Sequence, residues 1–363
     1  MELNKKIAII CNYQLLPERV GGMDYFFWDF DKKCKENGIE IDWFFPNKSN
    51  HGRYSELTIH CQNNENIENS FLDFCKINKV EYTHIITHFL ELCTPFFYKV
   101  KQLSNAKIIA VDHNPRPIAG YSLKKKIQKK VKGILFSRYI DFFIGVSNYT
   151  VKELIKDFGI HIEKKTITIY NGIALNNVQV RHNRNVIKPS FLTASHLRES
   201  KGIQDLIQAV SLLPETIKNE IVIDIYGDGA YRLELEKLIT SLVLEKNFNF
   251  KGSSSVLKSI YCNYDYMLQP THMECFSLSI LESLAANVPV VTTNVGGNEE
   301  VVLNNFNGYV FKPQDINVLK GILEDVYLGN KTIEINTRQT IEDYFSLEKM
   351  LNKHLALIQN NKC

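Results

Sequence analysis

The chain has 363 residues, 44% of them hydrophobic and 23% charged, and a formal net charge of +3. This length suits two ordinary domains, the composition is that of a globular protein, and so small a charge does not indicate a nucleic-acid partner. No apolar run approaches the ~20 residues that cross a bilayer, and the apolar run near the N-terminus is too short for a signal peptide.

The eight cysteines show no C-x-x-C pair and no metal-ligand spacing. Such cysteines are typical of reduced thiols, and we expect no disulfide. We therefore predict a cytoplasmic protein that is neither translocated nor membrane-spanning. The cysteines are Cys11, Cys34, Cys61, Cys75, Cys93, Cys262, Cys275 and Cys363.

Short apolar runs that end in polar residues recur along the first half: 7–11, 39–45, 83–89, 107–111, 141–146 and 165–170. Helical patterns separate most of them, which is typical of βαβ units and a parallel sheet. Gly21 and Gly22 lie between the first run and a helix expected over 23–36. A strand, a glycine turn and a helix can bring backbone close to a phosphate, but a glycine pair alone is more often a plain turn.

Two histidines, His88 and His113, come at the ends of predicted strands. A lone histidine at a strand end is more often structural than functional. The residues alone therefore favour a structural role for both, and a ligand role for either depends on further resemblance.

Residues 121–139 form an unusually basic stretch. Apolar residues recur there at helical spacing, and lysines surround them: Leu123, Ile127, Val131, Ile134 and Leu135 among Lys124, Lys125, Lys126, Lys129, Lys130 and Lys132. A basic amphipathic helix is typical of a membrane surface, where each lysine contributes ~1 kcal/mol beside anionic lipid. The alternative is a solvated helix whose apolar residues lie in the core. The pattern leaves both open.

The boundary between two domains is expected near residue 180. A helix over 149–158 and the strand 165–170 close the first domain, and the polar, aperiodic residues 176–189 then predict a linker. We expect domains over 1–180 and 181–363.

The second half repeats the alternation of strands and helices. We expect strands at 191–194, 221–226, 249–252, 265–269, 288–293 and 307–311, and helices over 315–327 and 346–358. Lys201 and Gly202 precede an amphipathic helix, and a cation beside a helix N-terminus favours phosphate. The G-D-G turn that begins at Gly227 is a weak signal by itself.

Residues 269–302 carry the clearest functional pattern. Glu274 and Glu282 are eight apart, about 80° around a continuous helix, so they converge only if Glu274 lies in the preceding loop. The helix start would then offer the N–H groups of Phe276, Ser277 and Leu278 to an anion. A phosphate between two carboxylates that accept hydroxyl protons describes a nucleotide sugar. An alternative stays equally open. In it, one carboxylate interacts with the dipole at the helix N-terminus, and the other glutamate is solvated.

This region resembles the E-x7-E motif of retaining GT-B glycosyltransferases, the group 1 (family 4) class. The family pattern is roughly P-S-x-x-E-x-F-G-L-x-x-L-E-A-x-A-x-G-x-P-V-V, and the chain has P-T-H-M-E-C-F-S-L-S-I-L-E-S-L-A-A-N-V-P-V-V. Ser277 and Asn287 replace two family glycines. The run S-N-Y-T-V-K-E-L-I…I-T-I-Y-N-G-I likewise resembles the end of the family's first domain.

The resemblance implies an α/β protein with the GT-B fold. Two Rossmann-like, doubly wound parallel-sheet domains would face a cleft, and the last helix would cross back to the first domain. The implied activity is retaining transfer of a hexose-type sugar from a nucleoside-diphosphate donor, UDP in preference to GDP, without metal or cofactor. The implied acceptor is a saccharide or an undecaprenyl-linked saccharide in surface polysaccharide assembly, such as lipopolysaccharide or capsule. Peripheral contact with an anionic membrane would suit such an acceptor.

The resemblance also assigns roles to residues. His113 and Glu274 would contact the sugar, and Glu282 the ribose. Lys201 would bind the diphosphate, with His196 at the position of a family arginine and Arg198 two residues on. The remaining donor contacts would be Gly21, Gly22, Gly227, Lys251, Phe276, Ser277 and Leu278.

Metal independence is expected because the one D-x-D of note, Asp29 and Asp31, falls in a helix, where we expect both to face solvent. Two other functions stay open. One is a nucleotide-sugar binding or scaffold protein whose site has decayed, which the substitution at His196 keeps in view. The other is a GT-B-fold epimerase that acts on the nucleotide sugar. The sequence does not indicate an oligomeric state.

Overall fold

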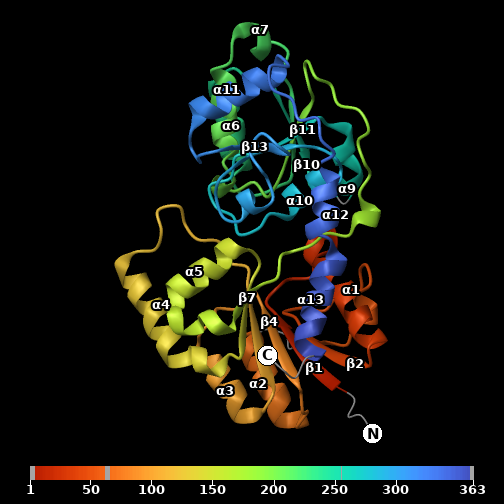
Figure 1. Cartoon of the computed structure of the whole chain (residues 1–363), viewed down its shortest axis with the longest axis vertical. Helices are drawn as coiled ribbons and strands as arrows, with labels where there is room; N and C mark the ends of the chain where they lie inside the picture. Colours follow the sequence, from red (N-terminus) through yellow and green to blue (C-terminus); the bar gives the residue numbers. More distant parts are fainter. Residues whose placement is uncertain (1–4, 62–65, 255, 360–363) are drawn as a thin grey trace. The chain divides into compact units, whose positions relative to one another are not determined.

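The computed structural model describes residues 5–61, 66–254 and 256–359, and these form two compact units (Figure 1). Unit 1 contains the described residues up to Pro115, residues 119–171, and those from Leu347 onward. Unit 2 contains residues 116–118 and 172–346. The main boundary thus falls shortly before the predicted position at 180, and the last helix is part of unit 1.

Unit 1 is built on a seven-stranded parallel sheet of order β3-β2-β1-β4-β5-β6-β7. Ile7 to Ile10 of β1 are completely buried, as expected for a central strand covered on both faces. The strands are β1 (Lys5–Cys11), β2 (Ile39–Phe44), β3 (Ile59–His60), β4 (His84–His88), β5 (Lys107–Asp112), β6 (Phe142–Gly145) and β7 (Thr166–Thr168).

The helices of unit 1 are α1 (Gly22–Glu36), α2 (Ile67–Asn78), α3 (Pro95–Leu103), α4 (Leu123–Phe136), α5 (Asn148–Phe158) and α13 (Leu347–Gln359). Helix α2 packs on α3, α3 on α4 and α4 on α5, whereas α1 packs on α13 (Figure 1). One continuous core joins the sheet to α2, α3 and α5, with Phe71, Phe97 and Phe143 among its fully buried side chains.

Unit 2 is built on a six-stranded parallel sheet of order β10-β9-β8-β11-β12-β13. Its strands are β8 (Phe191–Ala194), β9 (Ile223–Tyr226), β10 (Phe248–Gly252), β11 (Tyr266–Gln269), β12 (Val290–Thr293) and β13 (Gly308–Phe311). Its helices are α6 (Ile203–Ser211), α7 (Glu215–Lys218), α8 (Arg232–Ser241), α9 (Leu257–Ile260), α10 (Leu278–Ala285), α11 (Ile316–Tyr327) and α12 (Arg338–Tyr344). The apolar residues of α6 and α11 enter one core with β8, β9 and β11.

The predicted α/β class with two parallel-sheet domains is confirmed, because each unit has a parallel sheet with helices between its strands. The prediction that residues 176–189 link the two domains is wrong in one respect, because this stretch is part of unit 2. Its backbone and side chains are bonded to unit 2, since the Arg181 guanidinium lies 2.5 Å from Asp265 Oδ1 and the Asn185 N–H donates to the same oxygen at 2.7 Å. Asp265 is fully buried at the start of β11, so this polar stretch satisfies a buried carboxylate.

No helix among the described residues is long and apolar enough to cross a membrane. The seven cysteines in the described ranges are all free. Cys363 lies outside the described residues.

Candidate functional site

Two loops of unit 2 leave neighbouring strands at the carboxyl edge of the sheet. The first follows β8 and contains the short 3-10 helix η6 (Glu199–Lys201), and the second follows β11. The Ser200 carbonyl accepts hydrogen bonds from the His272 N–H at 2.8 Å and from the Thr271 hydroxyl at 3.1 Å. A Cβ atom on Gly202 would lie 1.8 Å from the Pro270 carbonyl oxygen, so the first loop can touch the second only with glycine there.

Lys201 and Glu274 meet across these two loops. The Lys201 Nζ lies 2.7 Å from Glu274 Oε2, and the two side chains are only 20% and 16% exposed. Each residue comes from a different motif in the sequence, 73 positions apart. The structure therefore places a cation and a carboxylate together at the sheet edge where open α/β sheets bind ligands.

His272 also lies at this edge of the sheet, and the sequence analysis assigned it no role. Its Nε2 lies 2.6 Å from Asp205 Oδ2 on α6, and both side chains are largely buried. The pair fastens the Glu274 loop to α6. The sequence offered little signal for it, because Asp205 lies one turn into a helix whose other inward residues are apolar.

Glu274 and Glu282 can converge only if Glu274 lies in the loop before the helix, and the structure meets this condition. Glu274 lies in the loop, and α10 begins at Leu278, so Glu282 is one turn into the helix. The hydroxyl of Ser277, the residue before the helix, bonds to the Gln269 side chain at 3.2 Å and makes no cap. The first N–H groups of α10 therefore have no side-chain cap. Because they also have no acceptor within the helix, they can donate to a ligand.

Glu282 is buried and already has partners. The Tyr261 hydroxyl donates to its Oε2 at 3.4 Å, and Lys258 Nζ lies 3.8 Å from its Oε1. Burial raises the pKa of Glu282 above its ordinary value, and the charge of Lys258 opposes that rise. The predicted alternative of a solvated Glu282 is therefore wrong.

The loop after β8 also touches the G-D-G turn after β9. A Cβ on Gly227, whose φ is +127°, would lie 1.9 Å from the Ser195 carbonyl oxygen. The exposed His196 donates from Nδ1 to the Asp228 carbonyl at 3.3 Å. Arg198 is also exposed, and among the described residues its guanidinium has no hydrogen bond. Lys251, on the edge strand β10, lies 3.5 Å from Asp224.

In unit 1, the predicted glycine loop is shaped by an aspartate. Neither Gly21 nor Gly22 has a positive φ, and the nearest atom to a Cβ on Gly21 would be 3.9 Å away. Asp24 is fully buried and accepts the Gly21 N–H at 2.8 Å. The hydroxyls of Tyr13 and Tyr54 donate to the same carboxylate at 3.0 and 2.5 Å. The loop conformation therefore depends on Asp24, while the roles of Gly21 and Gly22 stay predictions.

His113 does not stand alone. Its Nε2 lies 3.0 Å from Nδ1 of the buried His88, and its ring stacks on Phe89 at a centroid distance of 4.2 Å. His354 of α13 stacks near His88 at 6.3 Å. Burial lowers the pKa of His113 to about 3 and of His354 to about 4, and lowers that of His88 well below its ordinary value. All three rings are therefore neutral at pH 7.

Helix α4 corrects one part of the basic-stretch prediction. Lys129 faces inward, 3.0 Å from the buried Asp157 and over the Phe158 ring, so it does not belong to an outer surface. Lys124, Lys126 and Lys130 are exposed, and Lys125 is half-buried. The apolar residues are exposed as well, up to 74% for Leu123 and 69% for Ile134. The alternative with its apolar residues in the core is therefore wrong.

The D-x-D pair of α1 is also placed differently from the prediction. Asp31 is buried, where it accepts the Trp43 indole N–H at 2.9 Å and pairs with Lys35 at 2.7 Å. Asp29 is half-buried and pairs with Arg53. Both carboxylates are thus bonded within unit 1. Among the described residues, no group of three or more His, Cys, Asp or Glu side chains could hold a metal ion.

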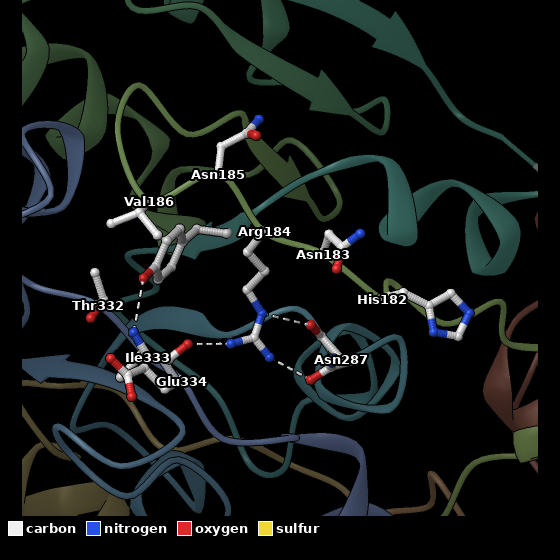
Figure 2. A pocket seen from close by; sticks show the side chains of 10 residues that line it. His182, Asn183, Arg184, Asn185, Val186, Asn287, Thr332, Ile333 and Glu334 are labelled. Atoms are coloured by element: carbon white, nitrogen blue, oxygen red, sulfur yellow. Dashed lines mark hydrogen bonds between the residues drawn. The ribbon is translucent and has the colours of Figure 1, made fainter.

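Unit 2 has a cavity of about 340 Å³ at the opposite end of β11, beside Tyr266 (Figure 2). Arg184 projects into it, but its guanidinium already donates to the backbone and side-chain oxygens of Asn287 and to the carbonyls of Ile333 and Ile335. Because its donors bond to the protein, Arg184 holds the chain together there. None of the predicted donor residues lines this cavity.

Residues 177–343 match the family model of glycosyl transferases group 1, which confirms the resemblance for this part of the chain. The GtfA subunit of a UDP-N-acetylglucosamine–peptide N-acetylglucosaminyltransferase from Streptococcus agalactiae is 32% identical over 176 residues, 47% of this chain and 34% of that protein. The chain thus spans about a third of that relative's length. N-acetyl-alpha-D-glucosaminyl L-malate synthase from Bacillus anthracis is 23% identical over 291 residues, 70% of this chain and 75% of that protein.

Solved structures share the fold over nearly the whole chain, which confirms the predicted GT-B fold. Alr3699/HepE from Anabaena, in complex with UDP and glucose, has a TM-score of 0.76 at 18% identity and covers 98% of this chain and 100% of its own. The lipopolysaccharide outer core galactosyltransferase WaaB has a TM-score of 0.73 at 18% identity, with 97% and 99% covered. At these identities the likeness concerns the fold.

Proposed function

We propose that this chain, whose residues 177–343 form a group 1 glycosyltransferase domain, moves a hexose-type sugar from a nucleoside-diphosphate donor to a saccharide acceptor with retention of configuration. The Lys201–Glu274 pair carries the proposal. An ammonium group suits the diphosphate, and a carboxylate suits the hydroxyls of the sugar. The nearby start of α10 adds N–H groups for the same anion.

Donor binding would exchange the partners of this ion pair. Lys201 would turn from Glu274 to the diphosphate, and Glu274 would accept hydroxyl protons of the sugar. Lys201 would keep an anionic partner and Glu274 would keep hydrogen-bond donors, so neither charge would be left without a partner, which would be costly. His113 of unit 1 would donate to the sugar as a neutral imidazole.

Arg198 is better suited than His196 to replace the family arginine. The guanidinium of Arg198 is exposed and, among the described residues, has no hydrogen bond, whereas His196 already uses Nδ1 on Asp228. A guanidinium is also permanently charged and can bind a phosphate with two parallel hydrogen bonds. Together with Lys201 and the helix start, it would neutralise the leaving group without a metal ion.

UDP is our preferred donor nucleotide. The names of the GtfA subunit and of the Anabaena complex both include UDP. Surface polysaccharide assembly is the setting we favour, since one protein of the same fold is a lipopolysaccharide galactosyltransferase. In the nucleotide, Glu282 would accept from the ribose in exchange for its bond with Tyr261.

A panel of UDP- and GDP-sugars, incubated with the full chain and saccharide acceptors, tests the proposal. We expect acceptor-dependent release of free nucleoside diphosphate. Inversion at C-2 of the sugar without such release would instead identify an epimerase. Binding of the donor without turnover would identify a binding protein.

We also propose that α4 rests on an anionic membrane, where a lipid-linked acceptor would be found. Its sequence, LKKKIQKKVKGILF, contains no acidic residue, and its apolar residues lie outside the core. A helix with this arrangement buries its apolar face between lipid headgroups while its lysines contact the phosphates. Sedimentation with anionic and with neutral vesicles tests this contact, and equal binding to both would contradict it.

A further inference from the structure

The ring cluster of unit 1 contains two histidines, His88 and His354, for which the proposed mechanism has no role. His88 ends β4, its side chain is fully buried, and its strand lies between β1 and β5. The rings of Phe26 and Phe27 lie 5.5 and 6.4 Å from it. Among the described residues, the one hydrogen bond of its side chain is the 3.0 Å contact of Nδ1 with Nε2 of His113.

Only one proton can lie between these two nitrogens, so one ring donates and the other accepts. If His113 were the donor, His88 would carry its own proton on Nε2. That atom is buried and, among the described residues, has no hydrogen-bond partner. A buried N–H without an acceptor is rarer than a buried acceptor without a donor. The geometry therefore favours donation from His88 Nδ1 to His113 Nε2.

We propose that His88 is a positioning residue for His113: its Nδ1–H occupies Nε2 of His113 and so keeps the proton of His113 on Nδ1. This fixes both the tautomer and the plane of the His113 ring, which the Phe89 ring supports from one face. The inference rests on the proposed contact of His113 with the sugar. A histidine whose tautomer is set by the hydrogen bond of its other nitrogen is a common arrangement in functional sites.

His354 completes the cluster without entering the hydrogen-bonded pair. Its Nδ1 donates to the Met350 carbonyl at 2.9 Å, which fixes its tautomer independently. It packs against Phe26 and Phe30 of α1 at 5.1 and 5.8 Å. We therefore assign to it packing of the cluster, and assign the control of His113 to His88 alone.

The first experiment reads the tautomers directly in the full chain labelled with 15N-histidine. Long-range proton–nitrogen correlation spectra distinguish Nδ1–H from Nε2–H, and the missing signal of His113→Gln assigns His113. We expect Nδ1–H for His113 in the wild type and a shift toward Nε2–H in His88→Phe. His88→Asn, whose amide can donate from about the place of Nδ1, should restore the wild-type tautomer.

The second experiment measures turnover of the same variants. We expect His88→Phe to lower kcat by about ten- to a hundredfold, as for outer partners of metal-bound histidines, with the donor KM changed less than about twofold. His88→Asn should recover most of the loss. His84→Phe is the matched control, because His84 is a buried histidine at the other end of β4 whose Nδ1 is hydrogen-bonded to the Thr83 hydroxyl at 3.2 Å and not to His113.

Three results would each overturn the proposal: Nε2–H on His113 in the wild type, an unchanged His113 tautomer in His88→Phe, or an unchanged kcat in that variant. A similar loss in His84→Phe would also overturn it, since the effect would then be general damage to β4. The tautomer can be read without turnover. A chain that transfers no sugar but keeps the His88-dependent tautomer would contradict the proposed function and still support the positioning of His113.

Discussion

The two units hold their candidate site residues by different kinds of contact. In unit 2, the candidate site residues Lys201 and Glu274 are paired at a sheet edge, and the apolar residues of α10 are buried. In unit 1, the candidate site residue His113 belongs to a buried, neutral cluster of imidazole and aromatic rings, while the apolar residues of α4 face solvent. The candidate site of unit 2 thus depends on an ion pair between two loops, and that of unit 1 on contacts among uncharged rings.

This contrast separates two kinds of information. The unit that binds the donor, by our proposal, uses charges whose spacing along the chain is a recognisable motif. The other unit depends on burial and on contacts between distant segments, such as α13 with α1, that no local pattern reveals. A buried histidine is informative, because burial of a polar side chain is costly unless it is hydrogen-bonded.

The largest expected effect concerns the charged pair of unit 2. Lys201→Ala and Glu274→Ala should each lower the kcat/KM of sugar transfer by about a hundred- to a thousandfold, the usual cost of losing a group that stabilises charge in the transition state. Release of nucleoside diphosphate under subsaturating donor measures the effect.

Lys320→Ala is the matched control for this loss. Lys320 also pairs with a glutamate of unit 2, Glu324, but on α11. We expect nearly normal activity from it. If Lys201→Ala and Glu274→Ala both kept full activity, the assignment of the donor site to this sheet edge would be wrong.

The buried histidines of unit 1 predict a loss of stability in acid. The pKa of His354 is lowered to about 4 and that of His113 to about 3, so below the ordinary value of 6.5 the unfolded chain binds protons that the folded chain does not. The free energy of unfolding should therefore fall as the pH drops below 6.5, by about 2 kcal/mol per histidine at pH 5. Chemical unfolding of the full chain between pH 7.5 and 5 measures this slope.

Replacing one of these histidines should reduce the slope. His354→Phe keeps an aromatic ring against Phe26 and removes one titrating group. We expect this variant to lose about 2 kcal/mol less than the wild type between pH 7.5 and pH 5. An identical slope in both proteins would mean that His354 can be protonated in the folded state, contrary to its burial.

The outer face of α4 predicts a smaller, surface-specific effect. Ile134→Asn should weaken sedimentation with anionic vesicles about tenfold, since an isoleucine side chain contributes up to ~2 kcal/mol when it leaves water. Ile77→Asn is the matched control, because Ile77 is an equally exposed isoleucine of unit 1 on α2. Equal losses from the two substitutions would remove α4 as the contact.

The lysines of α4 sharpen the same comparison. Lys126→Ala should lower affinity for anionic vesicles several-fold, from a contribution of ~1 kcal/mol per lysine. Lys129→Ala should leave that affinity unchanged and lower stability, because Lys129 is the partner of the buried Asp157. If Lys129→Ala weakened vesicle binding and Lys126→Ala did not, the orientation of α4 in the structure would be wrong.

Much of this fold could be predicted because its signals are local. The run 7–11 is apolar at every position, which is typical of a strand buried on both faces, and β1 is such a strand. The condition on Glu274 and Glu282 came from helix geometry alone. These features depend on neighbours in the chain and therefore need no knowledge of the tertiary structure.

The remaining errors concern residues whose partners are distant in the sequence. Lys129 faces inward because Asp157 is buried on the neighbouring helix, and Asp31 is buried because Trp43 donates to it. The polar stretch 176–189 was mistaken for a free linker because its partner, Asp265, comes some 80 residues later. In each case a polar side chain is satisfied by a contact that periodicity cannot show.

The smallest expected effect concerns Asn287, where the chain departs from the family glycine. Its φ of +60° suits glycine, but its side chain donates to the Arg181 carbonyl at 2.8 Å and accepts the Thr337 N–H at 3.0 Å. Asn287→Gly should relieve roughly 1 kcal/mol of backbone strain and lose these bonds and that of Arg184, for a net destabilisation of about 1 kcal/mol.

Asn305 provides the matched control, since it is an exposed asparagine of unit 2 with a φ of +61°. Among the described residues its side chain has no hydrogen bond, so Asn305→Gly should be neutral or slightly stabilising. Denaturant unfolding of both variants compares the two. If Asn287→Gly were also stabilising, the side chain would contribute nothing to holding residues 181–184 on unit 2, and the asparagine would merely tolerate the turn that the family forms with glycine.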